Sequence, residues 1–532
     1  MPKYPYKTPY KAGQDNLHLP GLDIHAPVFP LSALFIIIFV LFTLFFPDQA
    51  NDSLFAAKNF AINQFDWLFS YSANMFVLFS ILLVFTPLGR IRIGGADAQA
   101  DFSYLSWLSM LFAAGMGIGL MFWGVAEPLA YASGWAHTPL NVEAGSDEAM
   151  QVAMAATLYH WTLHPWAIYA IVGLSLAFFH YNKKLPLTIR SVFYPLFGER
   201  TWGWAGHIVD LLAVIATIFG LATSLGLGAQ QASGGFSFLF DMGNTTGLQV
   251  TIIAIVSAIA LVSVVRGLDG GVKVLSNINM SLAMLLLLFI IFTGPTLDIL
   301  SGVIDNAVNY ATYLLPLSES HNRPDQDWFH TWTIFYWAWW ISWSPFVGMF
   351  IARVSKGRTV REFILAVLIT PSIVTLIWMS AFGGIALDQY QQGIGELANG
   401  VGDVSLAMFQ MFEHLPMSSV ISFIGIILVL VFFITSSDSG SLVVDSITAG
   451  GKTNAPVSQR IFWVLMVGCI AVTLLIVGGS AALKSLQAGA VSAGLPFTVV
   501  LVIMCISLMK ALYNEHRQIQ GLKPIYPPDQ EG

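Results

Sequence analysis

The chain carries little charge. Aspartate, glutamate, lysine and arginine make up 10% of its 532 residues, whereas hydrophobic residues make up 56%. A soluble domain has about 25% charged residues, so a soluble globular protein is excluded and a polytopic membrane protein is predicted. Cysteine is scarce as well: Cys469 and Cys505 both stand in apolar runs, where packing or lipid contact is the expected role.

Several chemical signatures are also missing. The chain has no Walker motif, no cluster of metal ligands and no nucleophile triad. The lack of a phosphate-binding loop argues against an ATP-driven pump, and the lack of a nucleophile argues against a membrane enzyme. We therefore expect no enzymatic activity, no cofactor and no nucleic-acid partner. The polar first 26 residues show no cleavable signal peptide, which favours an uncleaved first span.

Windows of about 20 apolar residues predict an all-α integral membrane protein. Several windows are too long to cross the bilayer upright, so those helices should tilt or break. We expect twelve spans, near residues 28–46, 67–88, 105–133, 149–180, 208–240, 248–266, 273–294, 328–353, 361–386, 418–438, 460–479 and 489–512.

The positive charges test this partition, because cytoplasmic loops are rich in lysine and arginine. With the N-terminus in the cytoplasm, only Lys58, Arg323 and Lys484 fall outside, and the other 20 of the 23 Lys and Arg residues fall inside. Both termini are therefore expected in the cytoplasm, and the number of spans should be even.

Two segments between the spans have helical character. Residues 299–317, in the longest predicted outside segment, place apolar side chains at near-helical spacing. This pattern predicts an amphipathic helix on the outer face. Residues 403–415 are a second, shorter candidate.

A glycine-rich stretch interrupts the third span. Gly115, Gly117 and Gly119 occupy alternate positions, although each glycine costs a helix about 1 kcal/mol relative to alanine. Close packing against neighbouring helices is one explanation. The other is a helix unwound within the membrane, whose free backbone groups line a cavity and bind an ion and a carboxylate.

Aromatic residues cluster deep in two spans, whereas membrane proteins usually keep them in belts at the interface. In the fourth span Trp161, Trp166 and Tyr169 share one broad face, at about 100° per residue. Aromatic faces bind quaternary ammonium groups, which offer a charge but no N–H. A transporter for a trimethylammonium solute is therefore the leading hypothesis, and a purely structural aromatic face is the alternative.

The second cluster fills the eighth span with seven aromatic residues between Trp332 and Trp343. Trp337, Trp340 and Trp343 recur at every third position and define one side of the helix. Ser342, Ser344 and Pro345 then follow, and we expect them to interrupt this helix just after the cluster.

Polar groups are rare in the remaining spans. Thr435 and Ser436 end an apolar run in the tenth span, where hydroxyl oxygens could bind a small cation such as sodium or could merely cap the helix end. Glu127, Asp210 and Asp438 are the carboxylates that fall inside spans. Each is a candidate proton relay, although Glu127 precedes Pro128 and could pair locally.

Three motifs together resemble the signatures of the betaine/choline/carnitine transporter family. They are the glycines at 115–119, the His160–Tyr169 segment and the segment 335–350, and the similarity extends over about residues 25–512. The resemblance implies a transporter in the bacterial inner membrane, often assembled as a homotrimer. It also implies two inverted five-helix repeats, and divides the chain into a cytoplasmic segment (1–27), two peripheral helices (28–104), a first repeat (105–294), an external helix and loop (295–327), a second repeat (328–512) and a short tail (513–532).

The resemblance assigns substrate roles to individual residues. Gly115, Gly117 and Gly119 would face the substrate, and Ser224 would place a hydroxyl near its carboxylate. The aromatic box around the ammonium group would comprise Trp161, Trp166, Tyr169 and Trp340. Gate or transient contacts beside the pathway would come from Trp337, Trp339 and Trp343.

Sodium is the coupling ion that the resemblance implies. Its site, between the third and tenth spans, would comprise Ala113, Met116, Phe432, Thr435 and Ser436. A second sodium site in the family uses two threonines one turn apart in the fifth span; here Thr217 matches the first, but Leu221 replaces the other. That site therefore lacks a ligand unless Thr223 or Ser224 substitutes. The tail also lacks the long basic run of osmosensing relatives.

Position 119 bears on the cargo. Choline-specific relatives tend to have an acidic residue there, whereas Gly119 leaves no charge to balance a simple cation. We therefore expect sodium symport of a zwitterion such as glycine betaine. Proton-coupled choline uptake and sodium-independent exchange of carnitine and γ-butyrobetaine are the alternatives within transport. A ligand sensor is disfavoured because the sequence offers no output domain.

Overall fold

The computed structural model describes residues 4–115, 117–266 and 273–525. Among them, ten helices are long and apolar enough to cross a membrane, which agrees with the predicted all-α membrane architecture. These are α1 (Val28–Phe45), α2 (Pro47–Phe85), α5 and α6 (Asp147–Trp161 and Leu163–Ala177, continued by a π-helical turn to Asn182), α8 (Trp204–Phe240), α9 (Thr246–Arg266), α10 (Lys273–Thr293), α14 (Val360–Gln392), α16 (Ser418–Thr448), α17 (Val457–Gly478) and α18 (Ala482–Ile519).

The two other predicted spans are not single apolar helices. The glycine-rich span is divided into α3 (Tyr104–Gly115) and α4 (Ile118–Ser133), with Gly117 fully extended at φ −171° and ψ −179°. The predicted break in this helix is therefore confirmed. The eighth span consists of a short α12 (Gln326–Trp328), a π-helical turn (Phe329–Thr333) and α13 (Ile334–Val354).

The predicted interruption at Ser342–Pro345 is wrong, because α13 continues through Pro345. The hydroxyls there bond to carbonyls instead of opening the helix: Ser342 Oγ donates to the Ala490 carbonyl of α18 at 3.3 Å and Ser344 Oγ to the Ile341 carbonyl at 2.7 Å. A break that we did not predict falls in the fourth span. Thr162, at φ −115° and ψ −112°, separates α5 from α6.

Several predicted boundaries also need correction. Helix α2 begins at Pro47, well before the predicted 67, and bends at Phe65, whose φ of −135° is not helical. Helix α16 continues ten residues beyond Asp438, to Thr448, and α18 continues to Ile519, into the predicted tail. Polar residues at these ends lower the hydropathy of a window but do not stop a helix.

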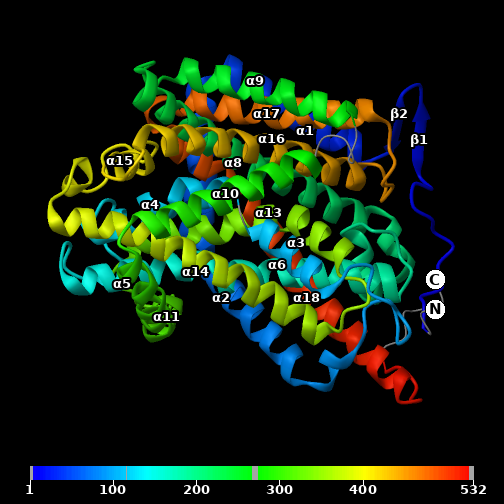
Figure 1. Cartoon of the computed structure of the whole chain (residues 1–532). Coiled ribbons are helices and arrows are strands. Elements are labelled where there is room, and N and C mark those ends of the chain that lie inside the picture. The colour runs from blue at the N-terminus through cyan, green and yellow to red at the C-terminus, as the bar shows by residue number, and fades with distance from the viewer. Residues whose placement is uncertain (1–3, 116, 267–272, 526–532) are drawn as a thin grey trace.

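Both predicted connecting helices are present. Helix α11 (Thr296–Ser318) packs against α5 and α14, and α15 (Ala407–Glu413) packs against α4 and α16. They lie at the end of the bundle away from the two termini, as Figure 1 shows. The aromatic helix α13 packs against α6, α8, α16 and α18, so it occupies the centre of the bundle.

Residues 4–27 form a segment that packs on the bundle, which we call the N-terminal clip. Strands β1 (Asn16–Leu19) and β2 (Leu22–His25) pair as an antiparallel hairpin. The clip lies on the same side of the bundle as the two termini, the terminal side (Figure 1). It reaches the turn between α16 and α17 through Gly13, whose N–H donates to the Gly450 carbonyl at 3.0 Å. It reaches the end of the α6 segment through Tyr6, whose N–H donates to the Lys183 carbonyl at 3.1 Å.

His25 anchors the clip in a buried charged cluster. Its Nε2 lies 3.2 Å from Arg190 Nη1, and Arg190 Nε donates to Asp210 Oδ2 at 2.5 Å. The His207 ring lies 5.0 Å from the His25 ring, and the more exposed Asp15 carboxylate lies 4.0 Å from His25 Nε2. Burial, together with the Arg190 guanidinium and His207, lowers the pKa of His25 from 6.5 to about 3, so this side chain is neutral near pH 7.

Acidification should therefore loosen the clip. Because the folded pKa of His25 is lower than its unfolded value, its contribution to stability is complete above pH 6.5 and is lost as the pH falls from 6.5 towards 3. At pH 5.5 one such histidine costs about 1.4 kcal/mol, or tenfold in the opening equilibrium. We expect trypsin to cut after the exposed Lys7 and Lys11 about ten times more readily at pH 5.5 than at pH 7.5. The rates are compared with those of His25→Gln, which corrects for the pH dependence of trypsin and should show no such increase.

Candidate functional site

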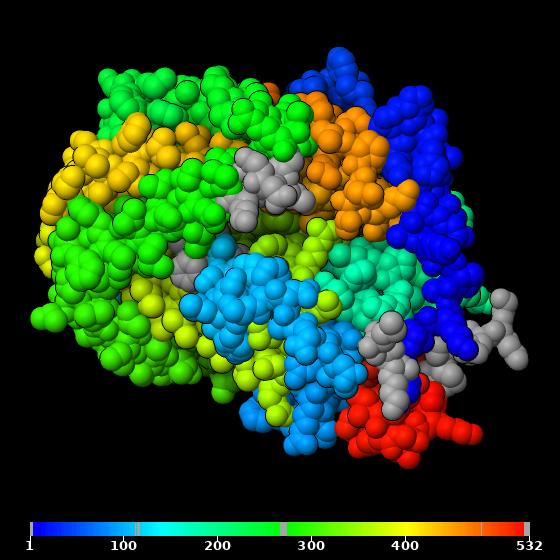
Figure 2. Space-filling view, turned by 45° about the vertical axis from the view of Figure 1, so that its right-hand side comes forward, coloured from blue at the N-terminus to red at the C-terminus, as the bar shows by residue number. Residues whose placement is uncertain are grey.

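A cavity of about 1440 Å³ lies in the middle of the bundle. Its walls come from α3, α4, α5, α6, α8, α10, α13, α14 and α16, and it reaches Phe102 before α3 and Ser276 near the start of α10. The chain that follows α13 lies next to this opening, and there Gly357 N–H donates to the Ile93 carbonyl. The neighbouring Gly94 N–H donates to Asn182 Oδ1, which lies beside the clip. The cavity therefore opens towards the terminal side. Figure 2 shows the surface hollowed between α10, in green, and α3, in light blue.

The described residues that line the cavity are all uncharged. Aromatic rings and small polar groups make up much of its wall. An uncharged wall offers no side chain of opposite charge to an organic solute that carries a net charge, and burying such a charge unpaired is costly. It suits a solute whose own charges cancel.

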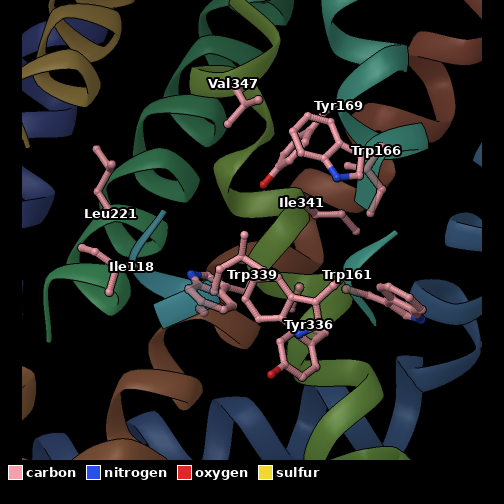
Figure 3. Packing of buried hydrophobic residues seen from close by; sticks show 14 of the residues in the cluster. Ile118, Trp161, Trp166, Tyr169, Leu221, Tyr336, Trp339, Ile341 and Val347 are labelled. Atoms are coloured by element: carbon pink, nitrogen blue, oxygen red, sulfur yellow. The ribbon is translucent and has the colours of Figure 1, made fainter. Parts of the chain in front are cut away.

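The four predicted box residues form a connected group of rings in this wall. Trp161 meets Trp340 edge to face, with ring centroids 4.9 Å apart and planes at 81°. Tyr169 links Trp340 at 6.1 Å to Trp166 at 5.3 Å. Figure 3 shows Trp161 and Trp339 beside Tyr336, with Trp166 and Tyr169 gathered nearby. The sequence-predicted box is thus brought together by α5, α6 and α13.

The three other predicted tryptophans lie in two places. Trp339 and Trp343 line the cavity, and their indole N–H groups donate to Ser224 Oγ at 3.2 Å and to the Gly220 carbonyl at 2.8 Å, both on α8. Trp337 is fully buried away from it, stacked on His164 with centroids 5.2 Å apart. Ser224 itself lines the cavity, where its hydroxyl lies next to α13.

The three glycines lie where α3 ends and α4 begins, and Gly117 and Gly119 line the cavity. Gly115 is the last residue of α3, and Gly117 precedes α4 with open space where a Cβ would stand. Gly119 lies against the box: a Cβ there would come within 2.5 Å of Trp161 Cη2 and 3.2 Å of Trp339 Cη2. Only a residue without a side chain fits between these two rings.

The predicted sodium ligands fall in the same cavity where they are described. Ala113, Phe432, Thr435 and Ser436 line it, and Met116 lies outside the described residues. Because α3 ends at Gly115, the carbonyls of its last turn lack helical partners and are available to a cation. Thr435 and Ser436 stand in the middle of α16, so the helix-cap explanation of these hydroxyls is wrong.

Thr217, the candidate for a second sodium site, is fully buried in α8, and its Oγ1 donates to the Ala213 carbonyl at 2.7 Å. Leu221 fills the next turn and packs against Gly440 of α16. Thr223 donates to the Phe219 and Leu486 carbonyls at 2.9 and 3.0 Å. Of the residues considered for the second sodium site, Thr217, Thr223 and Ser224, only Ser224 lines the cavity.

The intramembrane carboxylates all have partners. Asp210 pairs with Arg190, and Asp438 accepts from Ser263 Oγ at 2.5 Å. Glu127 bonds to aromatic side chains and to His160, behind the box. Sequence reasoning missed Tyr336, a partner of Glu127, and Asn279, which lines the cavity from α10. The two asparagines of an otherwise apolar segment, 277 and 279, were the available signal.

Comparison with known proteins agrees with this geometry. The family model described as betaine/carnitine/choline family transporter matches residues 27–517. The chain is 59% identical to Glycine betaine transporter 1 of Vibrio parahaemolyticus, over 96% of this chain and 98% of that one. It is 58% identical to a glycine betaine/proline/choline/ectoine transporter of the same organism, over 96% and 91%. It is 41% identical to a glycine betaine transporter of Bacillus subtilis, over 92% and 94%. The chain is a membrane transporter rather than an enzyme, and it belongs to the betaine/carnitine/choline transporter family.

Proposed function

We propose that the protein imports glycine betaine together with sodium. The observation that carries this proposal is the group formed by Trp161, Trp166, Tyr169 and Trp340 in the wall of an uncharged cavity. Aromatic faces stabilise a trimethylammonium group by cation–π attraction. The Ser224 hydroxyl and the backbone around Gly117 offer donors for the carboxylate of the same solute. Relatives named as glycine betaine transporters support this choice of cargo.

The topology that we propose is twelve spans in two inverted repeats, with both termini in the cytoplasm of a bacterium. The two predicted spans that are not among the ten long apolar helices, α3–α4 and α12–α13, are the first helices of the two proposed repeats. The terminal side would then be cytoplasmic, and the cavity would open inward. Labelling of single cysteines at the exposed positions Lys11 and His321 from one side of intact cells tests the orientation.

We also propose a homotrimer that is held together by α11. This helix exposes an apolar stripe at helical spacing, formed by Leu297, Leu300, Ile304, Val308 and Leu315, each at least 53% exposed. Large exposed apolar patches mark interaction or membrane surfaces. Charged replacements at Ile304 and Val308 should yield monomers in light scattering if the stripe is a subunit contact, and leave the mass unchanged if it only faces lipid.

The experiment that tests the transport proposal is uptake of labelled glycine betaine into proteoliposomes. A sodium gradient should drive accumulation, whereas a proton gradient in potassium buffer should not. Accumulation with the proton gradient alone would favour the proton-coupled alternative. Exchange without any gradient would favour the carnitine-type exchanger. Choline, proline and ectoine are tested as competitors, since a relative's name includes them.

Removing two hydroxyls should weaken the coupling to sodium. Thr435 Oγ1 donates to carbonyls of its own helix at 3.0 and 3.1 Å, which leaves its lone pairs free for a cation. We expect Thr435→Ala combined with Ser436→Ala to raise the half-saturating sodium concentration of uptake about tenfold, the loss expected when a hydrogen bond to a charged group is removed.

Ser441→Ala is the matched control, because this hydroxyl bonds to the Asp438 carbonyl of the same helix and is fully buried. The control should keep the sodium dependence of the wild type. An unchanged half-saturating concentration in the double variant would place the coupling ion elsewhere.

A further inference from the structure

A buried carboxylate lies directly behind the aromatic box. Glu127, on α4, is fully buried. Its Oε2 accepts from Trp161 Nε1 at 2.7 Å and from the Tyr336 hydroxyl. Its Oε1 accepts from the Tyr131 hydroxyl at 2.9 Å and lies 3.0 Å from His160 Nδ1. One of the four groups that surround this carboxylate is thus the indole of a box residue.

His160 connects the same carboxylate to the other side of the box. Its ring is fixed by the contact of Nε2 with Thr333 Oγ1 at 2.9 Å and by stacking on Tyr336, with centroids 4.6 Å apart. Its backbone carbonyl accepts from Trp340 Nε1 at 2.9 Å. Trp161 and Trp340 are therefore both held through Glu127 and His160.

These hydrogen bonds are not a general feature of buried tryptophans in this chain. Several others are buried with no partner for the indole N–H among the described residues: Trp123, Trp328, Trp332, Trp337 and Trp378. By contrast, Trp161, Trp339, Trp340 and Trp343, all at the cavity, each donate to an oxygen. Trp107, Trp202 and Trp463, which do not line the cavity, also donate, but to hydroxyl oxygens. Among the described tryptophans, Trp161 alone donates to a carboxylate.

We propose that Glu127 and His160 are positioning residues that hold the indoles of Trp161 and Trp340 in the edge-to-face arrangement that receives the ammonium group. The proposal rests on the proposed function of the box. A ring fixed before binding does not lose rotational freedom when the ligand arrives, so preorganisation lowers the cost of binding. The carboxylate acts on the substrate through the rings, without touching it.

Two replacements of Glu127 separate this role from the role of its charge. In Glu127→Gln the amide oxygen can still accept from Trp161 and Tyr336. The amide N–H can donate to the Tyr131 hydroxyl and to His160 Nδ1, both of which can accept. The glutamine therefore keeps the anchor of Trp161 and removes the negative charge. Glu127→Ala removes both.

The test is the KM and maximal rate of labelled glycine betaine uptake in proteoliposomes with a fixed sodium gradient. We expect Glu127→Ala to raise KM about tenfold, the effect of one hydrogen bond to a charged group, and Glu127→Gln to stay within about threefold of the wild type. A merely structural carboxylate would lower the amount of active carrier, and hence the maximal rate, without changing KM. Glu362→Ala is the matched control, because it removes a carboxylate that caps α14 far from the box, and it should leave KM unchanged.

Trp161→Phe keeps a ring but has no N–H, and it serves if Glu127→Ala does not fold. It should raise KM as Glu127→Ala does, and the double variant should add nothing further, since both changes remove one interaction. A wild-type KM in Glu127→Ala or Trp161→Phe would overturn the proposal, and so would a Glu127→Gln variant as impaired as the alanine. If Trp340→Ala also leaves KM unchanged, the box itself is wrong; if it raises KM, only the positioning role fails.

Discussion

Replacing Trp340 by alanine is expected to raise the KM for glycine betaine about 30-fold. A desolvated cation–π contact is worth about 2 kcal/mol, and each 1.4 kcal/mol changes an affinity about tenfold. Trp340 is the box residue for which this loss should be most complete, because its ring contacts both Trp161 and Tyr169 and is partly open to the cavity. Initial rates of uptake over a range of substrate concentrations, at saturating sodium, measure the effect.

The phenylalanine variant separates the contribution of the aromatic face from that of the indole N–H. Trp340→Phe keeps an aromatic face but loses the bond from Nε1 to the His160 carbonyl, so its KM should lie between those of the wild type and of the alanine variant. Trp378→Phe is the matched control: Trp378 is fully buried in α14, stacks on Phe382 and has no partner for its N–H among the described residues. An unchanged affinity in both Trp340 variants would mean that the ammonium group binds elsewhere.

The sequence predicted the spans well where hydropathy alone decides them. Twenty apolar residues in a row can hardly avoid the membrane, and ten windows correspond to long helices. The break at Gly117 was also predictable, because three alternating glycines contradict helix propensity. The interruption predicted from serine and proline at Pro345 was wrong, because the effect of the serines depends on whether a neighbouring helix accepts hydrogen bonds from their hydroxyls. Here the Ala490 carbonyl of α18 does so for Ser342.

The four box residues line one cavity, but helical phase was not a sound reason to expect this for all of them. Helical phase placed Trp161 on one face with Trp166 and Tyr169, yet Thr162 interrupts the helix between them and resets that phase. The stripe of Trp337, Trp340 and Trp343 is likewise divided, since Trp337 packs on His164 away from the cavity. Aromatic composition predicted the kind of site, and tertiary packing selected its members.

The support of the box could not be predicted at all. Glu127 meets Trp161 and Tyr336 across 34 and 209 residues of sequence, and no local pattern reports such a pairing. The sequence could only offer a proton relay or a local partner for an intramembrane carboxylate. The N-terminal clip was not predicted either, for a similar reason. Its hairpin is short and polar, and contacts with distant turns hold it in place.

Gly119→Ala is expected to impair the box about as strongly as loss of a ring. The added Cβ would stand 2.5 Å from Trp161 Cη2 and 2.9 Å from its Cζ3, and the indole cannot rotate away without leaving Glu127, to which its N–H is bonded at 2.7 Å. Overpacking of this kind costs about 1–3 kcal/mol, so we expect KM for glycine betaine to rise about 30-fold, within a range of about 5- to 150-fold.

Gly384→Ala is the matched control for this last variant. Gly384 is a helical glycine of α14 with nothing within 4 Å of the added Cβ, so the change should leave KM as it is and stabilise the helix by up to about 1 kcal/mol. The same geometry bears on cargo. An acidic residue at 119, which the family resemblance associates with choline, needs a Cβ at the same place, and so it requires Trp161 to move as well as a charge to be added. If Gly119→Ala transports glycine betaine with the wild-type KM, the indole shifts freely, and Glu127 does not fix its position.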